Sequence, residues 1–353
     1  MMNSQGLIMD KKQKRNLFLI LSIIIGLAAL AYIFSIVSWS DVKNALSGAT
    51  FRLVVLFLII QLLIFLTLTW RWKIVLESQG YKDINIFSLL SYRLAGYAIS
   101  FITPAAKLGG EPVRAWLLSK KQEIPFRKAL SGVVIDKTID LSTSGTFFIL
   151  GALLVLISYA ISPGVRQVLI IAALVFFVLV TIFNYRMMRG KNFFYKIFTF
   201  TGLSKFKRLD GFKKKLIDFE KPIIKFYHED KKHFFQTIMI SALSWILMFI
   251  EYSILGDMVG VNLSLIEIFL IVSFVGVAII IPVPMALGTL EAGQIGAFGI
   301  IGLTAATGLA LAILVRIKDI VFVVAGLIIL AVHGLKFKDA VKQTKYLSAK
   351  KRK

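Results

Sequence analysis

The sequence predicts an all-α membrane protein whose chain crosses the bilayer several times. Hydrophobic residues make up 58% of its 353 residues and charged residues only 17%. Apolar runs long enough to cross the hydrocarbon core as a helix, about 20 residues each, recur along the chain. Lys and Arg outnumber Asp and Glu by 42 to 19, which on so apolar a chain indicates loops facing an anionic membrane surface rather than nucleic acid. Because the chain contains no cysteine, disulfides, thiolate metal sites and cysteine nucleophiles are excluded.

The apolar runs give the expected membrane helices in order. They are residues 16–37, 53–69, 142–161, 167–185, 234–255 and 265–281, with a longer run at 304–335 that Arg316, Lys318 and Asp319 interrupt. The first run follows a basic stretch, as in a signal peptide, but it is too long for one and no small-residue cleavage site follows, so we expect a retained anchor. With the hairpins described next, we expect about 7 to 9 membrane helices in a single transmembrane domain, residues 1–353.

Three segments rich in Lys and Arg set the expected orientation. They are the N-terminal residues 1–15, the loop at 186–233 and the tail at 336–353. Short basic segments mark the cytoplasmic side of a membrane, so we expect both termini in the cytoplasm. Phe and Tyr are interleaved with the basic residues of the loop, which favours an amphipathic segment on anionic lipid over an RNA-binding segment.

Residues 86–119 form the first of two expected hairpins. The basic residues place the chain on the cytoplasmic side both near residue 80 and near residue 190. The spans at 142–161 and 167–185 already make one round trip across the membrane, so residues 86–119 have to enter and leave on the same face. Its apolar helix, 86–102, is followed by Pro104, which ends a helix, and by Gly109 and Gly110, which permit a tight reversal. We predict a re-entrant hairpin beside a polar cavity, because broken backbone at membrane depth needs cover from protein or water.

Residues 265–303 form the second expected hairpin. In both hairpins a proline precedes a glutamate by seven residues with a Leu-Gly pair between them, Pro104 before Glu111 and Pro284 before Glu291. Two broken hairpins of opposite orientation are typical of inverted-repeat transporters, whose site lies at the repeat interface. A chance recurrence of Pro and Gly breaks is the alternative, and three full crossings after residue 263 also satisfy the orientation.

Charged residues in apolar surroundings mark the candidate site, because a charge inside a membrane usually faces a partner or a cavity. For Arg316 we weigh a lipid phosphate, with Asp319 setting its position and Lys318 beside it, against an internal Arg316–Asp319 ion pair. Lys107 at the first hairpin tip requires a cavity or a partner acid. Arg93 is expected to extend to the inner membrane surface, with contact to the substrate as the alternative.

Three further candidates lie near the start of the helix that follows each hairpin break. Glu111 and Arg114 share a helical face after Gly109 and Gly110, whose amides suit an anionic head group, although a simple ion pair fits equally. Glu291 follows Gly288 and suits either the site or a helix start.

Asp136 and Asp140 share one helical face, with Lys137 beside them. Two carboxylates at this spacing suit proton transfer or an amine-bearing head group. The alternative is a solvated face near the cytoplasmic interface. His228, His233 and His333 have no second ligand at coordinating spacing, so we expect no metal and no cofactor.

Four stretches carry a resemblance to a known family. They are Gly109-Gly110-Glu111-Pro112-Val113-Arg114-Ala115, then Asp136-Lys137-Thr138-Ile139-Asp140, then Pro282-Val283-Pro284 with Leu287-Gly288-Thr289-Leu290-Glu291-Ala292, and then Arg316. The chain resembles the lysylphosphatidylglycerol synthase transmembrane family, also called the flippase-like domain family, in a stand-alone archaeal or bacterial form. The resemblance implies a prokaryotic cell membrane location and the translocating half of the larger relatives, which move aminoacylated phospholipid between leaflets.

The chain departs from the family pattern in two places. The soluble aminoacyl-transferase domain of the larger relatives is expected to be absent, because the sequence ends at Lys353. Asp136-Lys137 stands where many relatives are expected to have Glu-Arg, which replaces a guanidinium fork by a point charge and puts bidentate phosphate recognition at Lys137 in doubt.

Together these observations favour a lipid translocator that is not an enzyme. The expected partners are a membrane lipid with an anionic head group and, further, a second copy of the chain or a glycosyltransferase or synthase that it positions. The first alternative is a non-catalytic membrane partner of a lipid glycosyltransferase or synthase. The second is a membrane lipid-modifying transferase, which no catalytic or metal motif supports. The expected substrate-binding residues are Lys107, Gly109, Gly110, Glu111, Arg114, Asp136, Lys137, Asp140, Gly288, Glu291, Arg316, Lys318 and Asp319.

Overall fold

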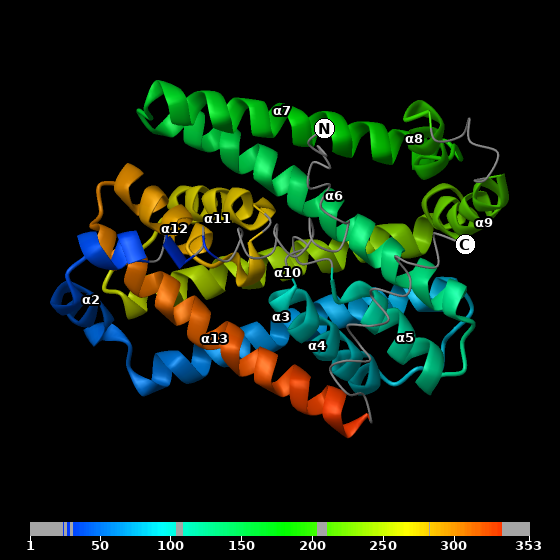
Figure 1. Cartoon of the computed structure of the whole chain (residues 1–353), viewed down its shortest axis with the longest axis horizontal. Coiled ribbons are helices and arrows are strands. Elements are labelled where there is room, and N and C mark those ends of the chain that lie inside the picture. Colours follow the sequence, from blue (N-terminus) through cyan, green and yellow to red (C-terminus); the bar gives the residue numbers. More distant parts are fainter. Residues whose placement is uncertain are drawn as a thin grey trace, which may run out of the picture.

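The computed structural model describes residues 24, 27–28, 31–103, 109–202, 210–281 and 283–333. Within these residues every regular element is a helix, as predicted (Figure 1). The helices are α2 (Trp39–Ala45), η1 (Leu46–Gly48), α3 (Phe51–Ser78), α4 (Ile86–Ile102), α5 (Glu111–Lys121), α6 (Phe126–Ser158), α7 (Pro163–Met188), α8 (Phe194–Phe200), α9 (Asp210–His228), α10 (Lys231–Met258), α11 (Leu265–Ile280), η4 (Pro284–Ala286), α12 (Thr289–Ile300) and α13 (Ala305–Val332). Lys107 and Pro104, the basic N-terminal segment and the basic tail lie outside the described residues.

The helices have the lengths of a polytopic membrane protein. Four of them, α3, α6, α7 and α10, are long and apolar enough to cross a membrane. The helix of the first hairpin, α4, has the predicted bounds, and α11 ends one residue before its predicted end. The run that charged residues interrupt in the sequence is one continuous helix, α13.

The end of α3 differs from the sequence prediction. In the sequence, Trp70 and Trp72 flank Arg71 at the end of an apolar run, a pattern that predicts an interfacial belt, but α3 continues to Ser78. Only Trp70 is exposed, at 48%, whereas Trp72 is fully buried and Arg71 is 1% exposed. The belt prediction is wrong for these two residues because they pack inside the bundle and not at its surface.

The predicted basic loop contains two helices, α8 and the amphipathic α9 (Figure 1). The buried carboxylate of Glu220 on α9 accepts hydrogen bonds from the backbone N–H groups of Phe193, Phe194 and Tyr195, at 2.6, 2.6 and 3.0 Å. These N–H groups lie at the start of α8, where a helix has no partners of its own for them. One carboxylate therefore joins the two helices.

The first hairpin is held together by a very close approach of backbone to backbone. Helices α4 and α5 run antiparallel, and the N–H of Gly110 donates to Ser100 Oγ at 2.8 Å. A Cβ atom at Gly110 would lie 1.8 Å from the carbonyl oxygen of Gly96. The chain thus needs glycine at position 110 because any side chain would push the helices apart, which is a different reason from the reversal that we expected.

The second hairpin, α11 and α12, reverses through a break with left-handed backbone. Met285 has φ 59° and Gly288 has φ 73°. A Cβ atom at Gly293 on α12 would lie 3.1 Å from the Cβ of Ala278 on α11, so these helices also pack closely and run antiparallel. Gly288 serves the turn, since this backbone conformation favours glycine.

The two hairpins belong to two halves with the same packing pattern, α3 to α6 and α10 to α13. Helix α4 packs on α13 as α11 packs on α6, and α5 packs on α6 as α12 packs on α13. Corresponding residues are 180 positions apart, including Gly96 and Gly276 as well as Glu111 and Glu291.

The halves face in opposite directions. Helices α3 and α10 pack on one another with Gly48 against Met258 and Arg71 against Ser241, so these equivalent helices run antiparallel. The arrangement supports the inverted repeat that the two sequence breaks indicated.

We expect Gly110→Ala to lower the free energy of unfolding by about 1 to 3 kcal/mol or more, because the new methyl group meets backbone that cannot move without separating α4 from α5. Gly276→Ala in the second hairpin is the matched control, since a Cβ atom there has no neighbour within 4 Å. Thermal unfolding of both variants in detergent checks this. Equal melting temperatures would show that the first hairpin is not packed this closely.

Candidate functional site

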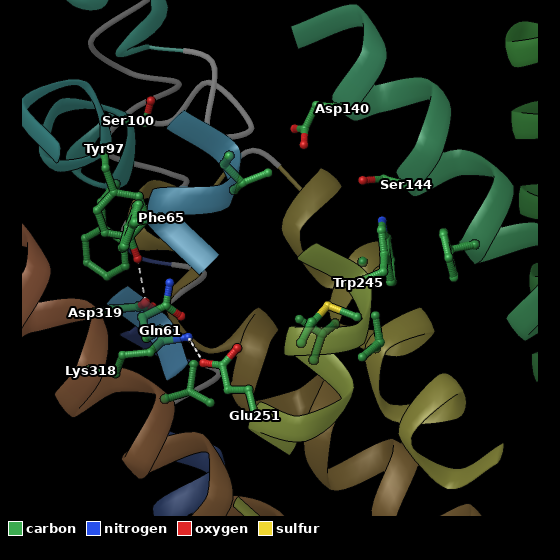
Figure 2. Close-up of a pocket in the computed structure, with 18 of the residues that line it drawn as sticks. Gln61, Phe65, Tyr97, Ser100, Asp140, Ser144, Trp245, Glu251, Lys318 and Asp319 are labelled. Atoms are coloured by element: carbon green, nitrogen blue, oxygen red, sulfur yellow. Dashed lines mark hydrogen bonds and ion pairs between the residues drawn. The ribbon is translucent and has the colours of Figure 1, made fainter. Parts of the chain in front are cut away.

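A cavity of about 440 Å³ lies between the two halves of the protein. Side chains from α3, α4, α5 and α6 of the first half and from α10, α11, α12 and α13 of the second half line it. Figure 2 shows Asp140 on one side of this cavity and Glu251, Lys318 and Asp319 on the other. The repeat interface is where inverted-repeat transporters bind their substrates.

The most buried charge at the site is Asp136 on α6, which is 1% exposed. Its carboxylate accepts hydrogen bonds from Arg71 on α3 at 2.9 Å, Arg93 on α4 at 2.9 Å and Arg114 on α5 at 2.8 Å. Such a buried carboxylate requires charged partners, because an unpaired charge inside a membrane protein is very unfavourable. We call Asp136 and its three arginines the Asp136 cluster.

Local packing explains why Arg114 reaches this cluster. The ring of Trp72 lies under its guanidinium, with 4.3 Å from the guanidinium carbon to the ring centroid, a cation–π contact. Gly96 leaves space for its stem, since a Cβ atom at residue 96 would lie 2.5 Å from Arg114 Cγ. The buried Trp72 ring and the glycine at position 96 thus both accommodate the Arg114 side chain.

Three further charged residues surround the Asp136 cluster and line the cavity. Lys137 Nζ donates to Asp140 at 3.1 Å, and Arg114 donates to Glu111 at 2.8 Å. The side chains of Lys137, Asp140 and Glu111 are 22%, 31% and 15% exposed. We call these three residues the rim. Cluster and rim together hold four basic and three acidic side chains, so this side of the cavity carries excess positive charge.

A second group of charges lies across the cavity (Figure 2). Lys318 Nζ on α13 donates to Glu251 on α10 at 2.9 Å, and Tyr97 Oη on α4 donates to Asp319 at 2.6 Å. Glu251 and Asp319 are each 4% exposed. Both carboxylates line the cavity.

Arg316 has a different environment from its neighbours on α13. Its guanidinium binds Glu291 at 2.7 and 3.0 Å and donates to the carbonyl oxygens of Met285 and Ala286 in the break of the second hairpin. Neither Arg316 nor Glu291 lines the cavity. The Arg316–Asp319 ion pair, one of the two alternatives for Arg316, is not formed, because Arg316 binds Glu291 on α12 while Asp319 accepts a hydrogen bond from Tyr97 on α4.

The structure excludes the solvated face that was the alternative for Asp136. Arg93 does not extend to the membrane surface, since it is 8% exposed and binds Asp136. Gly109 and Gly110 are buried in the turn of the first hairpin, and the Gly110 amide already donates to Ser100. The predicted Glu111–Arg114 pair is confirmed.

Sequence reasoning did not select Arg71, Tyr97 and Glu251. Arg71 lies between two tryptophans, which is also the pattern of a membrane interface, and Glu251 lies near the end of an apolar run. The repeat itself could have identified Arg71 and Glu251, because these two residues are 180 positions apart, as are Asp136 and Arg316. Equivalent positions in the two halves therefore carry opposite charges.

The equivalent charges are paired differently in the two halves. Arg71 binds Asp136 directly at 2.9 Å, whereas Glu251 binds Lys318 and Arg316 binds Glu291. The halves thus share a fold but differ in their ion pairs. In the part of the chain that the structure describes, no three His, Asp or Glu side chains gather in a way that suits a metal ion.

Comparison with known proteins gives a family and several relatives. The family described as "Lysylphosphatidylglycerol synthase TM region" matches residues 19–326. A UPF0104 membrane protein of Methanocaldococcus jannaschii is 34% identical over 200 residues, which are 56% of this chain and 55% of that protein. A UPF0104 membrane protein of Methanothermobacter thermautotrophicus is 25% identical over 283 residues, which are 74% of this chain and 79% of that protein. The matched region thus spans about half the length of the first relative. No solved structure matches.

We expect Asp136→Asn to destabilise the protein strongly, because the amide leaves three buried guanidinium groups without their counter-charge. Loss of one partner from a buried ion pair costs about 3 to 5 kcal/mol. The control is Asp218→Asn, which removes an exposed partner of Lys221, where a surface pair contributes little. Thermal unfolding in detergent measures both, and an unchanged melting temperature for Asp136→Asn would contradict this account of the cluster.

Proposed function

The chain belongs to the lysylphosphatidylglycerol synthase transmembrane family, and from this membership we propose that it is a lipid translocator. It moves an anionic or modified phospholipid, or a polyprenyl-linked lipid, between the leaflets of the membrane. The proposal extends the membrane lipid-related role that the family indicates. We expect no enzymatic activity from this chain.

The observation that carries the proposal is a cavity lined by both charged and aromatic side chains. The rim lies on one side, and Glu251, Lys318 and Asp319 lie across from it. Aromatic side chains line the cavity as well, including Phe147, Trp245 and Phe269, with Phe147 and Trp245 stacked at 4.1 Å between ring centroids. A lipid needs both kinds of contact, since its head group needs polar contacts and its chains need apolar ones. The cavity suits a molecule that crosses the membrane with its head group shielded from the hydrocarbon.

The excess positive charge of the cluster and rim favours a phosphate-bearing head group. Lys137 is the most exposed basic side chain of this set, at 22%. Its ammonium is a flexible point charge, which exchanges partners more readily than a guanidinium fixed by several hydrogen bonds. A phosphate entering the cavity competes with Asp140 and Glu111 for Lys137, so binding requires no rearrangement of the Asp136 cluster.

Orientation is part of the same proposal. The two hairpins are re-entrant from opposite faces, the first from the cytoplasm, and both termini are cytoplasmic. The distribution of Lys and Arg supports this orientation. The antiparallel packing of α3 on α10 supports the opposite direction of the two halves.

The first test identifies the lipids that remain bound to the protein purified in mild detergent. We expect mass spectrometry to find an anionic, glycosylated or aminoacylated lipid strongly enriched over the bulk membrane extract, because the cavity presents excess positive charge. A bound fraction that matches the bulk lipid would count against translocation. It would favour a non-catalytic partner that positions a lipid glycosyltransferase or synthase.

The second test measures translocation of the enriched lipid in liposomes. We expect Lys137→Gln to slow it about tenfold or more, since a hydrogen bond to a charged group is worth about 1.5 to 3 kcal/mol. Lys43→Gln, which removes an exposed charge on α2, is the control and should translocate at the normal rate. Equal rates for the two variants would remove Lys137 from the binding site.

A further inference from the structure

One carboxylate in the cavity differs from all the others in its partners. Four carboxylates line the cavity, and three of them lie within 4.0 Å of a basic nitrogen: Glu111 near Arg114 and Lys137, Asp140 near Lys137 and Arg71, and Glu251 near Lys318. Among the residues that the structure describes, Asp319 has no such partner. Its single hydrogen bond comes from the hydroxyl group of Tyr97, at 2.6 Å.

The basic groups near Asp319 are all engaged elsewhere. On its own helix, Lys318 lies next to Asp319 and interacts with it electrostatically, but its hydrogen bond goes to Glu251, and Arg316 binds Glu291. On α4, Arg93 binds Asp136 and the carbonyl oxygen of Leu68.

The other ionisable groups that face this region are acidic or phenolic. They are Glu251 and Tyr252 on α10, Glu291 on α12 and Tyr97 on α4. From α3 comes a neutral side chain, the buried Gln61, which also lines the cavity (Figure 2). None of these groups compensates a negative charge on Asp319.

A buried carboxylate with one neutral hydrogen-bond donor and no basic nitrogen within 4.0 Å can take up a proton without breaking an ion pair. The proton has a route, because Asp319 lines the same cavity as the partly exposed rim. Uptake breaks no covalent bond and needs no further reactant.

The single hydrogen bond of Asp319 also connects the two halves of the protein. Tyr97 is on α4 in the first hairpin and Asp319 is on α13 in the second half. These two helices pack very closely, since a Cβ atom at Gly326 on α13 would lie 2.3 Å from the carbonyl oxygen of Leu94 on α4. A bond from a hydroxyl to a carboxylate is stronger than one between neutral groups, so protonation weakens the link between hairpin and helix.

We propose that Asp319 is a proton-binding site in the cavity, and that the Tyr97–Asp319 hydrogen bond couples this proton to movement of the first hairpin. Lipid translocation is then coupled to a proton gradient. This coupling rests on the function proposed above, whereas the proton site itself does not.

The proton site is tested on the full-length protein in detergent by infrared difference spectroscopy between acidic and alkaline buffers. We expect a carboxylic acid signal that Asp319→Asn removes and that Tyr97→Phe retains, since the phenylalanine variant keeps the carboxyl group. The matched control is Asp257→Asn, which removes an exposed acid at the end of α10 and should retain the signal. Persistence of the whole signal in Asp319→Asn would overturn the proton site.

The coupling is tested in liposomes with and without an imposed pH gradient. We expect the gradient to accelerate translocation by the original protein and by Asp257→Asn, and we expect this acceleration to be lost in Asp319→Asn and in Tyr97→Phe. If all four proteins respond to the gradient equally, the coupling is overturned although translocation stands. If the original protein moves no lipid under either condition, the proposed function fails and the coupling with it, while the infrared experiment still decides the proton site.

Discussion

The architecture of the first half depends on one buried negative charge. Asp136 is held by three arginines that come from three different helices. Each of these charges is very unfavourable inside a membrane protein without the others. The four helices α3, α4, α5 and α6 are therefore fixed relative to one another, and Gly96, which lies close to Gly110, leaves the space that the Arg114 stem occupies.

The second half repeats the helices without repeating this cluster. At the position equivalent to Asp136 it has Arg316, and at the position equivalent to Arg71 it has Glu251. The reversed charges do not meet, because Arg316 holds the break of the hairpin and Glu251 binds Lys318. One half is thus fixed by a central cluster and the other by two separate pairs. The two halves thus share one fold but are stabilised by different ion pairs.

Hydropathy predicted the fold well, and it could not predict the site to the same extent. The bounds of α4 followed from the apolar run, which is a local signal. The partners of Asp136 lie 65, 43 and 22 residues before it in the chain, and no local pattern marks them. Arg71 was assigned to the membrane surface because two tryptophans flank it, whereas the ring of Trp72 in fact packs under Arg114.

Exposure separates the charges that build the protein from those that are free to meet a ligand. The Asp136 carboxylate and the Arg71 and Arg114 side chains are 1 to 5% exposed and each has several charged partners, so a ligand that displaced one of them would leave the others uncompensated. Lys137 and Asp140 are 22% and 31% exposed and exchange partners without that penalty. Asp319 is the exception, since it is as buried as the structural charges but forms no ion pair with a described residue, so a proton would bind it without displacing a charged partner.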